Sequence, residues 1–124
     1  MRLNEISGQI LDAAIEVHRV LGGPGLLESV YEESLAFELQ SRGLNVRRQV
    51  SVPIKYKGHN LSDPLRLDLL VEEQVVIECK AVAVYNQIFE VQALTYLRLL
   101  DLRLGVVINF GAPVIKDGFH RVAN

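Results

Sequence analysis

The sequence is poor in the residues that hold together secreted and zinc-binding domains. It contains one cysteine, Cys79, and three histidines that are scattered along the chain. A single cysteine cannot form an internal disulfide, and this arrangement lacks the spacing of a zinc site. Because a chain without disulfides is most simply placed in a reducing compartment, we expect a cytoplasmic protein.

Long apolar runs and low-complexity tracts are also missing. No stretch approaches the roughly 20 apolar residues that a membrane-spanning helix requires. The N-terminal segment MRLNEISGQI lacks the apolar block of a signal peptide. No repeat or linker interrupts the 124 residues, a length that suits one core. We therefore expect a single domain over residues 1–124, with no membrane association.

A large excess of positive charge is absent too, since the net charge is −2. This value by itself argues against a general nucleic-acid-binding protein, but the charges are unevenly distributed. Residues 1–41 carry a net charge of −5, whereas residues 42–66 carry +5. The basic middle segment could contact phosphates, or it could simply be a solvated hairpin face. Its candidate phosphate-binding residues are Arg47, Arg48, Lys55 and Lys57.

Apolar residues recur at helical spacing in three segments. The predicted helices cover residues 6–21, 27–42 and 86–101. The pair Gly22-Gly23 follows the first of them, and Gly43 follows the second. Glycine is common just beyond the last residue of a helix, so these positions support the predicted ends.

Elsewhere the apolar residues alternate with a period of two, which is typical of strands. The alternation predicts one long strand over residues 46–57, with Val46, Val50 and Val52 on one face, although Pro53 suggests an edge position. A second strand, residues 65–71, would direct all its odd-numbered residues to one face. The further predicted strands are residues 75–80, 104–110 and 119–122, the last after a turn at 116–118.

The connections between these elements predict the topology of the sheet. The short link at residues 72–74 indicates an antiparallel hairpin. The long link through the third helix indicates that strands 75–80 and 104–110 are parallel. We therefore expect an α/β protein with a mixed β-sheet flanked by α-helices.

The stretch VVIECKAV, residues 75–82, places two charges inside an apolar strand. Glu78 and Lys80 share one face, and the hairpin would bring Asp68 of the neighbouring strand opposite residue 78. Two carboxylates at this distance repel each other unless a cation lies between them. The two carboxylates could hold Mg²⁺, and the lysine could steady the attacking water, for phosphodiester hydrolysis. The alternative is a structural ion pair.

Polar residues on two of the predicted helices could complete such a site. Glu28 projects toward the apolar face of its helix, but Glu38 lies near that face as well, so helical angle alone does not select Glu28. Glu28 also lies in the first turn, where the helix dipole favours an acid. Gln92 and Tyr96 share a face of the third helix and could orient a water molecule and a phosphate. An ordinary amphipathic helix would also explain them.

Four blocks of sequence resemble a known family when they are taken together. The first, GLLESVYEESLAFEL, contains Gly25-x-x-Glu28-x-x-Tyr31, the signature of the GxxExxY proteins, which belong to the PD-(D/E)xK nuclease superfamily. The blocks LRLDLLVEEQVVIECKAV, QALTYL and LGVVINFG follow in the order typical of that family. The resemblance covers residues 5–122. One departure is Leu67, which replaces the proline that precedes the acid in many members.

The resemblance implies a restriction-endonuclease-like αβββαβ core preceded by an extra N-terminal helix. It also implies a nuclease that depends on Mg²⁺ or Mn²⁺ and acts on nucleic acid, DNA rather than RNA. The alternative is an inactive module of the same fold that binds nucleic acid or a protein. A homodimer is plausible because so small a chain has little surface for a duplex. The implied site residues are Asp68 and Glu78 as metal ligands with Glu28, Lys80 beside the nucleophile, and Gln92 with Tyr96.

Overall fold

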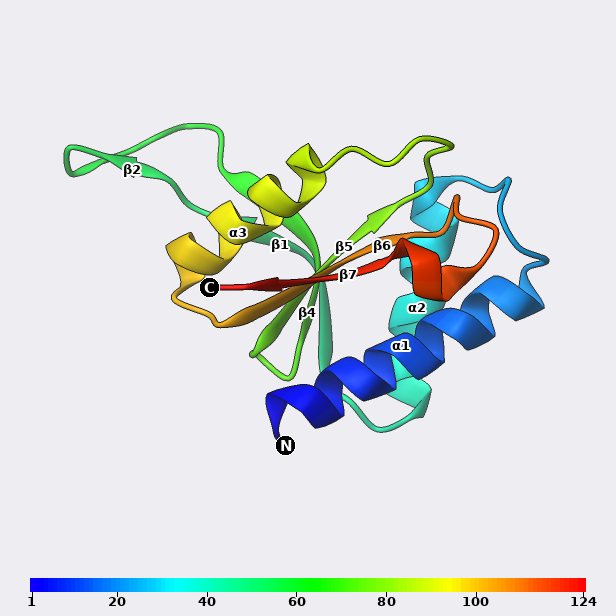
Figure 1. Cartoon of the computed structure of the whole chain (residues 1–124). Coiled ribbons are helices and arrows are strands. Elements are labelled where there is room, and N and C mark those ends of the chain that lie inside the picture. The colour runs from blue at the N-terminus through cyan, green and yellow to red at the C-terminus, as the bar shows by residue number, and fades with distance from the viewer.

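A computed structural model describes all 124 residues of the chain. Two helices come first, and a mixed sheet with a third helix follows (Figure 1). The helices are α1 (Leu3–Val20), α2 (Glu28–Ser41) and α3 (Ile88–Leu100), with a short 3₁₀ helix, η1 (Ile115–Gly118). The strands are β1 (Val46–Val52), β2 (Lys55–Tyr56), β3 (His59–Asn60), β4 (Leu65–Val71), β5 (Val75–Lys80), β6 (Leu104–Asn109) and β7 (Phe119–Ala123). None of the helices combines the length and the apolar character needed to cross a membrane.

Five strands form the main sheet in the order β1-β4-β5-β6-β7. Strands β5 and β6 are parallel, and the other neighbouring pairs are antiparallel. The predicted hairpin at residues 72–74, the crossover through α3 and the short last strand are therefore confirmed. Residues 116–118, expected to form a simple turn before that strand, are part of the 3₁₀ helix η1 instead. This mixed sheet with flanking helices agrees with the predicted restriction-endonuclease-like fold.

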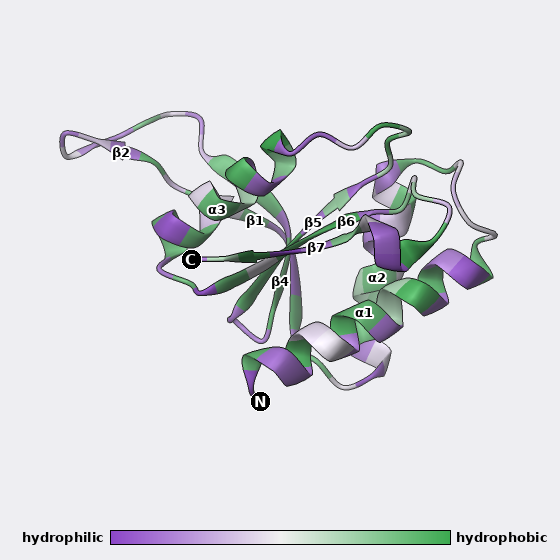
Figure 2. Ribbon diagram, viewed as in Figure 1, coloured by the Kyte–Doolittle hydropathy of each residue, from purple (hydrophilic) through white to green (hydrophobic).

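The helices cover both faces of the sheet and divide the core into two clusters. Helices α1 and α2 pack on one face, where Ile77 and Cys79 of β5 are buried among them. Helix α3 packs on the opposite face, where Val76 of β5 is buried. The hydropathy colouring shows mainly apolar strands between helices that carry both polar and apolar residues (Figure 2). Because β5 is central, its side chains are buried on both faces, and a charge on it is surrounded by protein.

Strand β4 changes face partway along its length. Leu67 packs on the α3 side of the sheet, whereas Leu69 packs on the α1–α2 side. The prediction that the odd-numbered residues of 65–71 share one face is therefore wrong. The change occurs at Asp68, which lies across from Gln49 in the register of β1 and β4. Gln49 has a left-handed φ of 51°, a conformation that is uncommon for a residue other than glycine and that interrupts regular alternation.

Strand β1 changes face at the same level and is shorter than predicted. Val46 packs against the α1–α2 cluster, whereas Val50 and Val52 belong to the α3 side, so these three residues do not share a face. The strand ends at Val52, just before Pro53, because proline lacks the N–H that would extend the ladder. Residues 55–57, predicted as the end of this strand, instead belong with residues 58–60 to the separate β2–β3 hairpin.

Candidate active site

The candidate site lies where β4 and β5 separate. Their backbone pairing ends at Leu69 and Ile77, and the next two residues, Asp68 and Glu78, bridge the strands with side chains. The Asp68 backbone N–H donates to Glu78 Oε1 at 3.2 Å, and the Cys79 backbone N–H donates to Asp68 Oδ2 at 2.8 Å. The two acids that the sequence singled out are therefore neighbours. In each of the two carboxylates, one oxygen takes no part in these hydrogen bonds.

Glu78 is almost fully buried, with 6% of its surface exposed. Burial, followed by the nearby negative charge of Asp68, raises the pKa of Glu78 to about 9. The backbone bond from Asp68 and the charge of Lys80 act in the opposite direction but are weaker. Without an added cation, Glu78 therefore holds a proton at neutral pH. A carboxyl group in this condition is a natural place for a cation to bind in exchange for the proton.

Glu32, which the sequence analysis did not single out, is a further buried acid of this site. It lies on α2 with 6% of its surface exposed, and it accepts bonds from Gln49 Nε2 at 2.6 Å and Arg48 Nη2 at 3.3 Å. Burial raises its pKa, the Gln49 bond offsets part of the shift, and the adjacent carboxyl of Asp68 adds to it. Helical spacing could have identified it, because Glu32 is three and seven residues before the buried Leu35 and Leu39.

The fully buried thiol of Cys79 lies within the electrostatic influence of four acids. Burial raises the pKa of this thiol, and the charges of four acids raise it further; these are Asp68, Glu32, Glu78 and Glu28. The thiol is therefore protonated and unreactive. The nearby cations are Lys80 and the half-exposed Arg48, so negative charge is in excess around β5.

This donor set fits Mg²⁺ or Mn²⁺. No three acidic, histidine or cysteine side chains enclose a space for a metal ion in the structure. However, Mg²⁺ is usually held by one or two carboxylates, with water and substrate phosphate completing its coordination. Asp68 and Glu78 supply two carboxylates with spare oxygens, and the surplus negative charge favours a cation. The residues present therefore suit a hard divalent ion better than zinc, which prefers histidine and cysteine.

Lys80 lies on the α3 side of β5, two residues after Glu78. Its ammonium group is 4.8 Å from the centre of the Phe89 ring, a distance at which a cation is attracted by an aromatic face. It forms no ion pair with Asp68 or Glu78, so the simple structural salt bridge considered from the sequence is not present. The Phe89 ring is itself held edge-on by Tyr85, with 5.4 Å between the ring centres.

Tyr96 lies close to the paired acids, whereas Gln92 is exposed. The Tyr96 hydroxyl donates to the backbone carbonyl of Arg66 in β4 at 3.3 Å. Burial raises the pKa of Tyr96, and the charges of Glu78 and Asp68 raise it further, which places the phenol within their field. Gln92 is one turn earlier on α3 and makes no hydrogen bond within the protein. Its amide is therefore available to a ligand.

The motif Gly25-x-x-Glu28-x-x-Tyr31 forms the start of α2. Gly25 has a φ of 115°, which favours glycine, and the Tyr31 hydroxyl donates to the Gly23 carbonyl at 2.7 Å and accepts from the Leu26 N–H at 3.2 Å. The Tyr31 ring stacks on Phe110 with 4.7 Å between centres. Tyr31 thus fixes the loop before the helix. Glu28 is exposed at the first helical position, one turn before Glu32.

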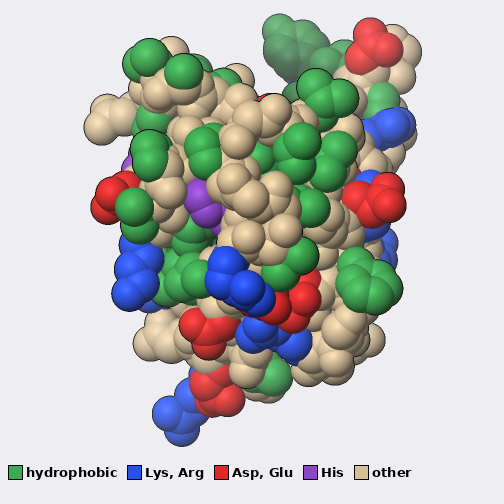
Figure 3. Space-filling view, turned by 90° about the vertical axis from the view of Figure 1, so that its right-hand side faces the viewer, with side chains coloured by type: hydrophobic (Ala, Val, Ile, Leu, Met, Phe, Trp, Pro, Cys, Tyr) green, Lys and Arg blue, Asp and Glu red, His purple; other side chains and the backbone are tan.

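The four candidate phosphate-binding residues do not form one patch. Arg47 pairs with Glu73 at 2.8 Å beside the β4–β5 turn, and Arg48 pairs with Glu32. Lys55 and Lys57 lie in the β2–β3 hairpin, toward the opposite end of β1. On the side of the molecule where α1 ends and α2 begins, acidic and basic side chains are interspersed (Figure 3). That face therefore carries no continuous basic surface.

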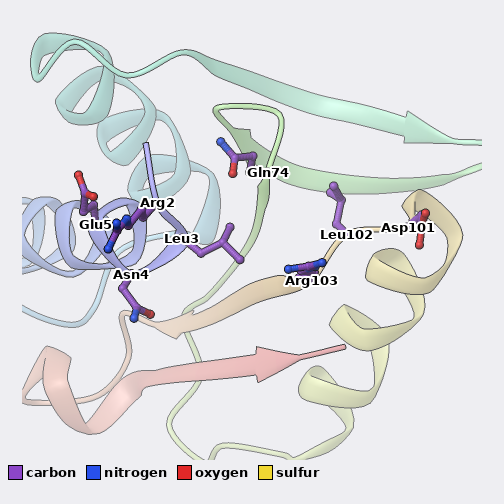
Figure 4. Close-up of a pocket in the computed structure, with 8 residues that line it drawn as sticks. All are labelled: Arg2, Leu3, Asn4, Glu5, Gln74, Asp101, Leu102 and Arg103. Carbon is purple, nitrogen blue, oxygen red and sulfur yellow. The ribbon is translucent and has the colours of Figure 1, made fainter.

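The largest hollow in the surface is remote from these acids. It has a volume of about 820 Å³ and lies where α1 begins, beside Gln74 and Arg103 (Figure 4). Gln74 is in the β4–β5 turn and Arg103 precedes β6, so this hollow is at the end of the sheet opposite Lys80. It is open to solvent and carries acidic as well as basic groups. Size alone therefore does not identify the site.

The fold and the paired acids together define a restriction-endonuclease-like protein. The sequence matches the family model of the PD-(D/E)XK nuclease superfamily over residues 4–122, and the chain therefore belongs to this superfamily. Membership indicates a nuclease-type function and binding to nucleic acid. Comparison with curated proteins and with solved structures gives no match.

Proposed function

We propose that the protein is a Mg²⁺- or Mn²⁺-dependent nuclease of the GxxExxY group that hydrolyses phosphodiester bonds in nucleic acid, DNA in preference to RNA. One observation carries the proposal. Asp68 and Glu78 bridge two separating strands, and the lysine of the same strand lies two residues further on. This is the arrangement of two acids and a lysine that the superfamily resemblance implies.

Asp68 and Glu78 would hold the cation, with an acid of α2 contributing directly or through water. Glu28 is the acid that the family resemblance assigns to this role, and the buried Glu32 is adjacent to Asp68 in the structure. A divalent cation at such a site polarises the scissile phosphate and helps to ionise the attacking water. Glu78 would release its proton when the cation binds, because the ion replaces the proton as its partner.

The other polar residues would act on the water and the substrate. The ammonium group of Lys80 would donate a hydrogen bond to the attacking water and stabilise the extra negative charge of the transition state. Phe89 would hold this ammonium in place while substrate is absent. Gln92, exposed on α3, and Tyr96, anchored to Arg66, would orient the substrate strand.

Affinity for the phosphate backbone would come from residues outside the paired acids. Lys55 and Lys57 are unpaired and exposed, whereas Arg47 and Arg48 would have to exchange their acidic partners for phosphate. Such contacts give salt-dependent affinity without sequence information. A second copy of the chain would extend this surface, and the proposal therefore includes a homodimer on the substrate.

The direct test is a cleavage assay on single-stranded, duplex and branched DNA and RNA, with Mg²⁺, Mn²⁺ or EDTA. We expect cleavage only with a divalent cation. Lys80→Ala and Asp68→Asn should each reduce the rate by at least about 100-fold, as expected for groups that stabilise transition-state charge. Lys116→Ala, which removes an exposed lysine of η1, is the matched control and should retain full activity.

Three results would count against the proposal. Cleavage that persists in both Lys80→Ala and Asp68→Asn would show that another site or a contaminant is responsible. Cleavage in EDTA would contradict the role of the cation. No cleavage of any substrate by folded protein, with nucleic-acid binding retained, would favour the inactive module of the same fold.

A further inference from the structure

The hairpin formed by β2 and β3 is a separate feature that projects from the body of the protein on the α3 side (Figure 1). Its two-residue turn consists of Lys57 with φ 49° and Gly58 with φ 83°. Positive φ at both central positions is the tight turn that matches the twist of a hairpin. Pro53 and Pro64 flank the hairpin and restrict its two connections to the sheet. The hairpin is therefore a defined element despite its small size.

One face of this hairpin presents two rings to solvent. Tyr56 and His59 are directly paired across β2 and β3, so their side chains share a face. Tyr56 is 60% exposed, and the Lys57 ammonium lies 5.5 Å from the centre of its ring. Nothing in the fold requires an exposed tyrosine here, because the hairpin is stabilised by its own turn and backbone pairing.

The composition of the hairpin favours a nucleic acid over a protein ligand. Residues 54–62 contain no acid, and Lys55 and Lys57 lie on either side of Tyr56. A base has a π face that stacks on tyrosine whatever its identity, and the Lys57 ammonium beside the ring would attract a phosphate. In a duplex the base faces are already stacked on each other, so only an unpaired segment can use this ring.

The hairpin emerges from the same end of the sheet as the candidate site. It joins the end of β1 to the beginning of β4, and Asp68 is the fourth residue of β4. Lys80 is at the end of β5, which runs antiparallel to β4, so it lies toward this end as well. A single strand could therefore extend from the paired acids to the hairpin along the α3 side.

We propose that the β2–β3 hairpin is a stacking platform, with Tyr56 as its ring, for an unpaired segment of the nucleic acid that the protein acts on. This inference rests on the proposed function for its choice of ligand. It adds the class of substrate, single-stranded nucleic acid or a branch with an unpaired strand.

Binding without cleavage tests this platform. Fluorescence anisotropy in EDTA would compare oligo-dT, oligo-rU and a duplex, each of about 16 nucleotides per strand, at the upper end of known site sizes. We expect Tyr56→Ala to weaken binding of the single strands by about 5- to 150-fold, the effect of losing one stacked base. Tyr56→Phe keeps the ring and should bind within about twofold of the wild type, and the weaker binding of duplex should hardly change in either variant. The dT and rU arms distinguish DNA from RNA as the source of the base.

Phe37→Ala is the matched control, because Phe37 is an aromatic residue on α2 that is even more exposed than Tyr56. It should bind like the wild type. The proposal is overturned if wild-type protein binds neither oligo-dT nor oligo-rU, or if Tyr56→Ala binds them normally. It is also overturned if Phe37→Ala loses as much affinity, or if light scattering shows that Tyr56→Ala only dissociates a dimer, since the hairpin would then be an interface between copies.

Failure of the stacking platform and failure of the nuclease proposal can be distinguished. If Tyr56→Ala loses affinity for single strands and the wild type cleaves nothing, the platform is correct and catalysis is absent. If the wild type cleaves and Tyr56→Ala binds and cleaves normally, the nuclease proposal stands and the platform is wrong. Circular dichroism of each variant checks that it is folded, and substitutions at exposed positions usually leave stability almost unchanged.

Discussion

Asp68 and Glu78 lie opposite each other on β4 and β5, and each is bound through its carboxylate to the other strand. The two bonds replace the backbone ladder, which ends one residue earlier. The geometry fixes both acids without a third group, but it places the buried carboxyl of Glu78 next to the half-buried carboxyl of Asp68. The protonation of Glu78 follows from this arrangement, and it has a measurable consequence.

The stability of the metal-free protein should fall as the pH rises from about 4.5 to about 9. Over this range native Glu78, with its raised pKa, keeps a proton that the unfolded chain releases, so rising pH favours the unfolded state. The contribution of the Glu78 proton to the free energy of unfolding is fully present below pH 4.5 and is lost as the pH rises past about 9. Urea unfolding in EDTA at a series of pH values measures this slope.

Glu78→Gln should make that pH dependence shallower and raise stability above neutral pH, because the amide has no proton to lose. Some slope should remain, since burial also raises the pKa of Glu32. Mg²⁺ should stabilise the wild type more at high pH than at low pH, because the cation competes with the proton. An unchanged slope in Glu78→Gln would show that Glu78 is ionised in the native protein.

The roles of Glu28 and Glu32 can be distinguished by substituting each of them with glutamine. Glu28 is exposed, so Glu28→Gln should change the free energy of unfolding by no more than about 0.5 kcal/mol. Glu32→Gln should stabilise the metal-free protein above neutral pH, because it removes a buried acid whose pKa is raised. We expect Glu28→Gln to slow cleavage, as the family resemblance implies. Normal cleavage by Glu28→Gln together with no cleavage by Glu32→Gln would assign that role to Glu32.

Much of the fold could be predicted because most segments bury their apolar residues with a clear period. The periods identified the three helices and the sheet, and the lengths of the links set the antiparallel hairpin and the parallel pair. The change of face at Asp68 could not be predicted. It depends on Gln49 in a left-handed conformation, and a glutamine gives no local signal of the kind that glycine or asparagine gives.

Only part of the candidate site could be predicted, because only some of its residues stand out in the local sequence pattern. Asp68 and Glu78 were found because charges in an apolar strand are conspicuous, and a short turn fixes the register of two strands. To identify which acid of α2 faces the site, the direction of the apolar face of the helix must be known. The apolar residues define that direction only approximately. Glu38, considered beside Glu28, pairs with Arg42 at 2.8 Å on the surface. The buried acid is Glu32 of α2, whose position depends on Gln49 and Arg48 of strand β1.

Tyr31 should contribute to stability through its hydroxyl. Tyr31→Phe keeps the stack on Phe110 but removes bonds to Gly23 and Leu26. A loss of about 1–2 kcal/mol in the free energy of unfolding is expected for two bonds at a partly buried loop. Urea unfolding measures it, and Tyr56→Phe, which removes an exposed hydroxyl, should have no effect. Equal stability of the two variants would mean that water replaces the Tyr31 bonds without cost.

Phe89 should position Lys80 through the face of its ring. Phe89→Leu keeps an apolar side chain but removes the attraction for the ammonium, which is worth about 0.5–1 kcal/mol at a partly exposed position. If the proposed nuclease site is correct, cleavage should slow by about two- to fivefold. The loss should appear in kcat rather than in KM, because the ammonium would act on the attacking water and not on the affinity for substrate. Phe37→Leu, a substitution on α2 remote from Lys80, is the control for the loss of an aromatic ring. Slower cleavage with a raised KM, an unchanged kcat and a lower melting temperature would show that Phe89 serves only packing.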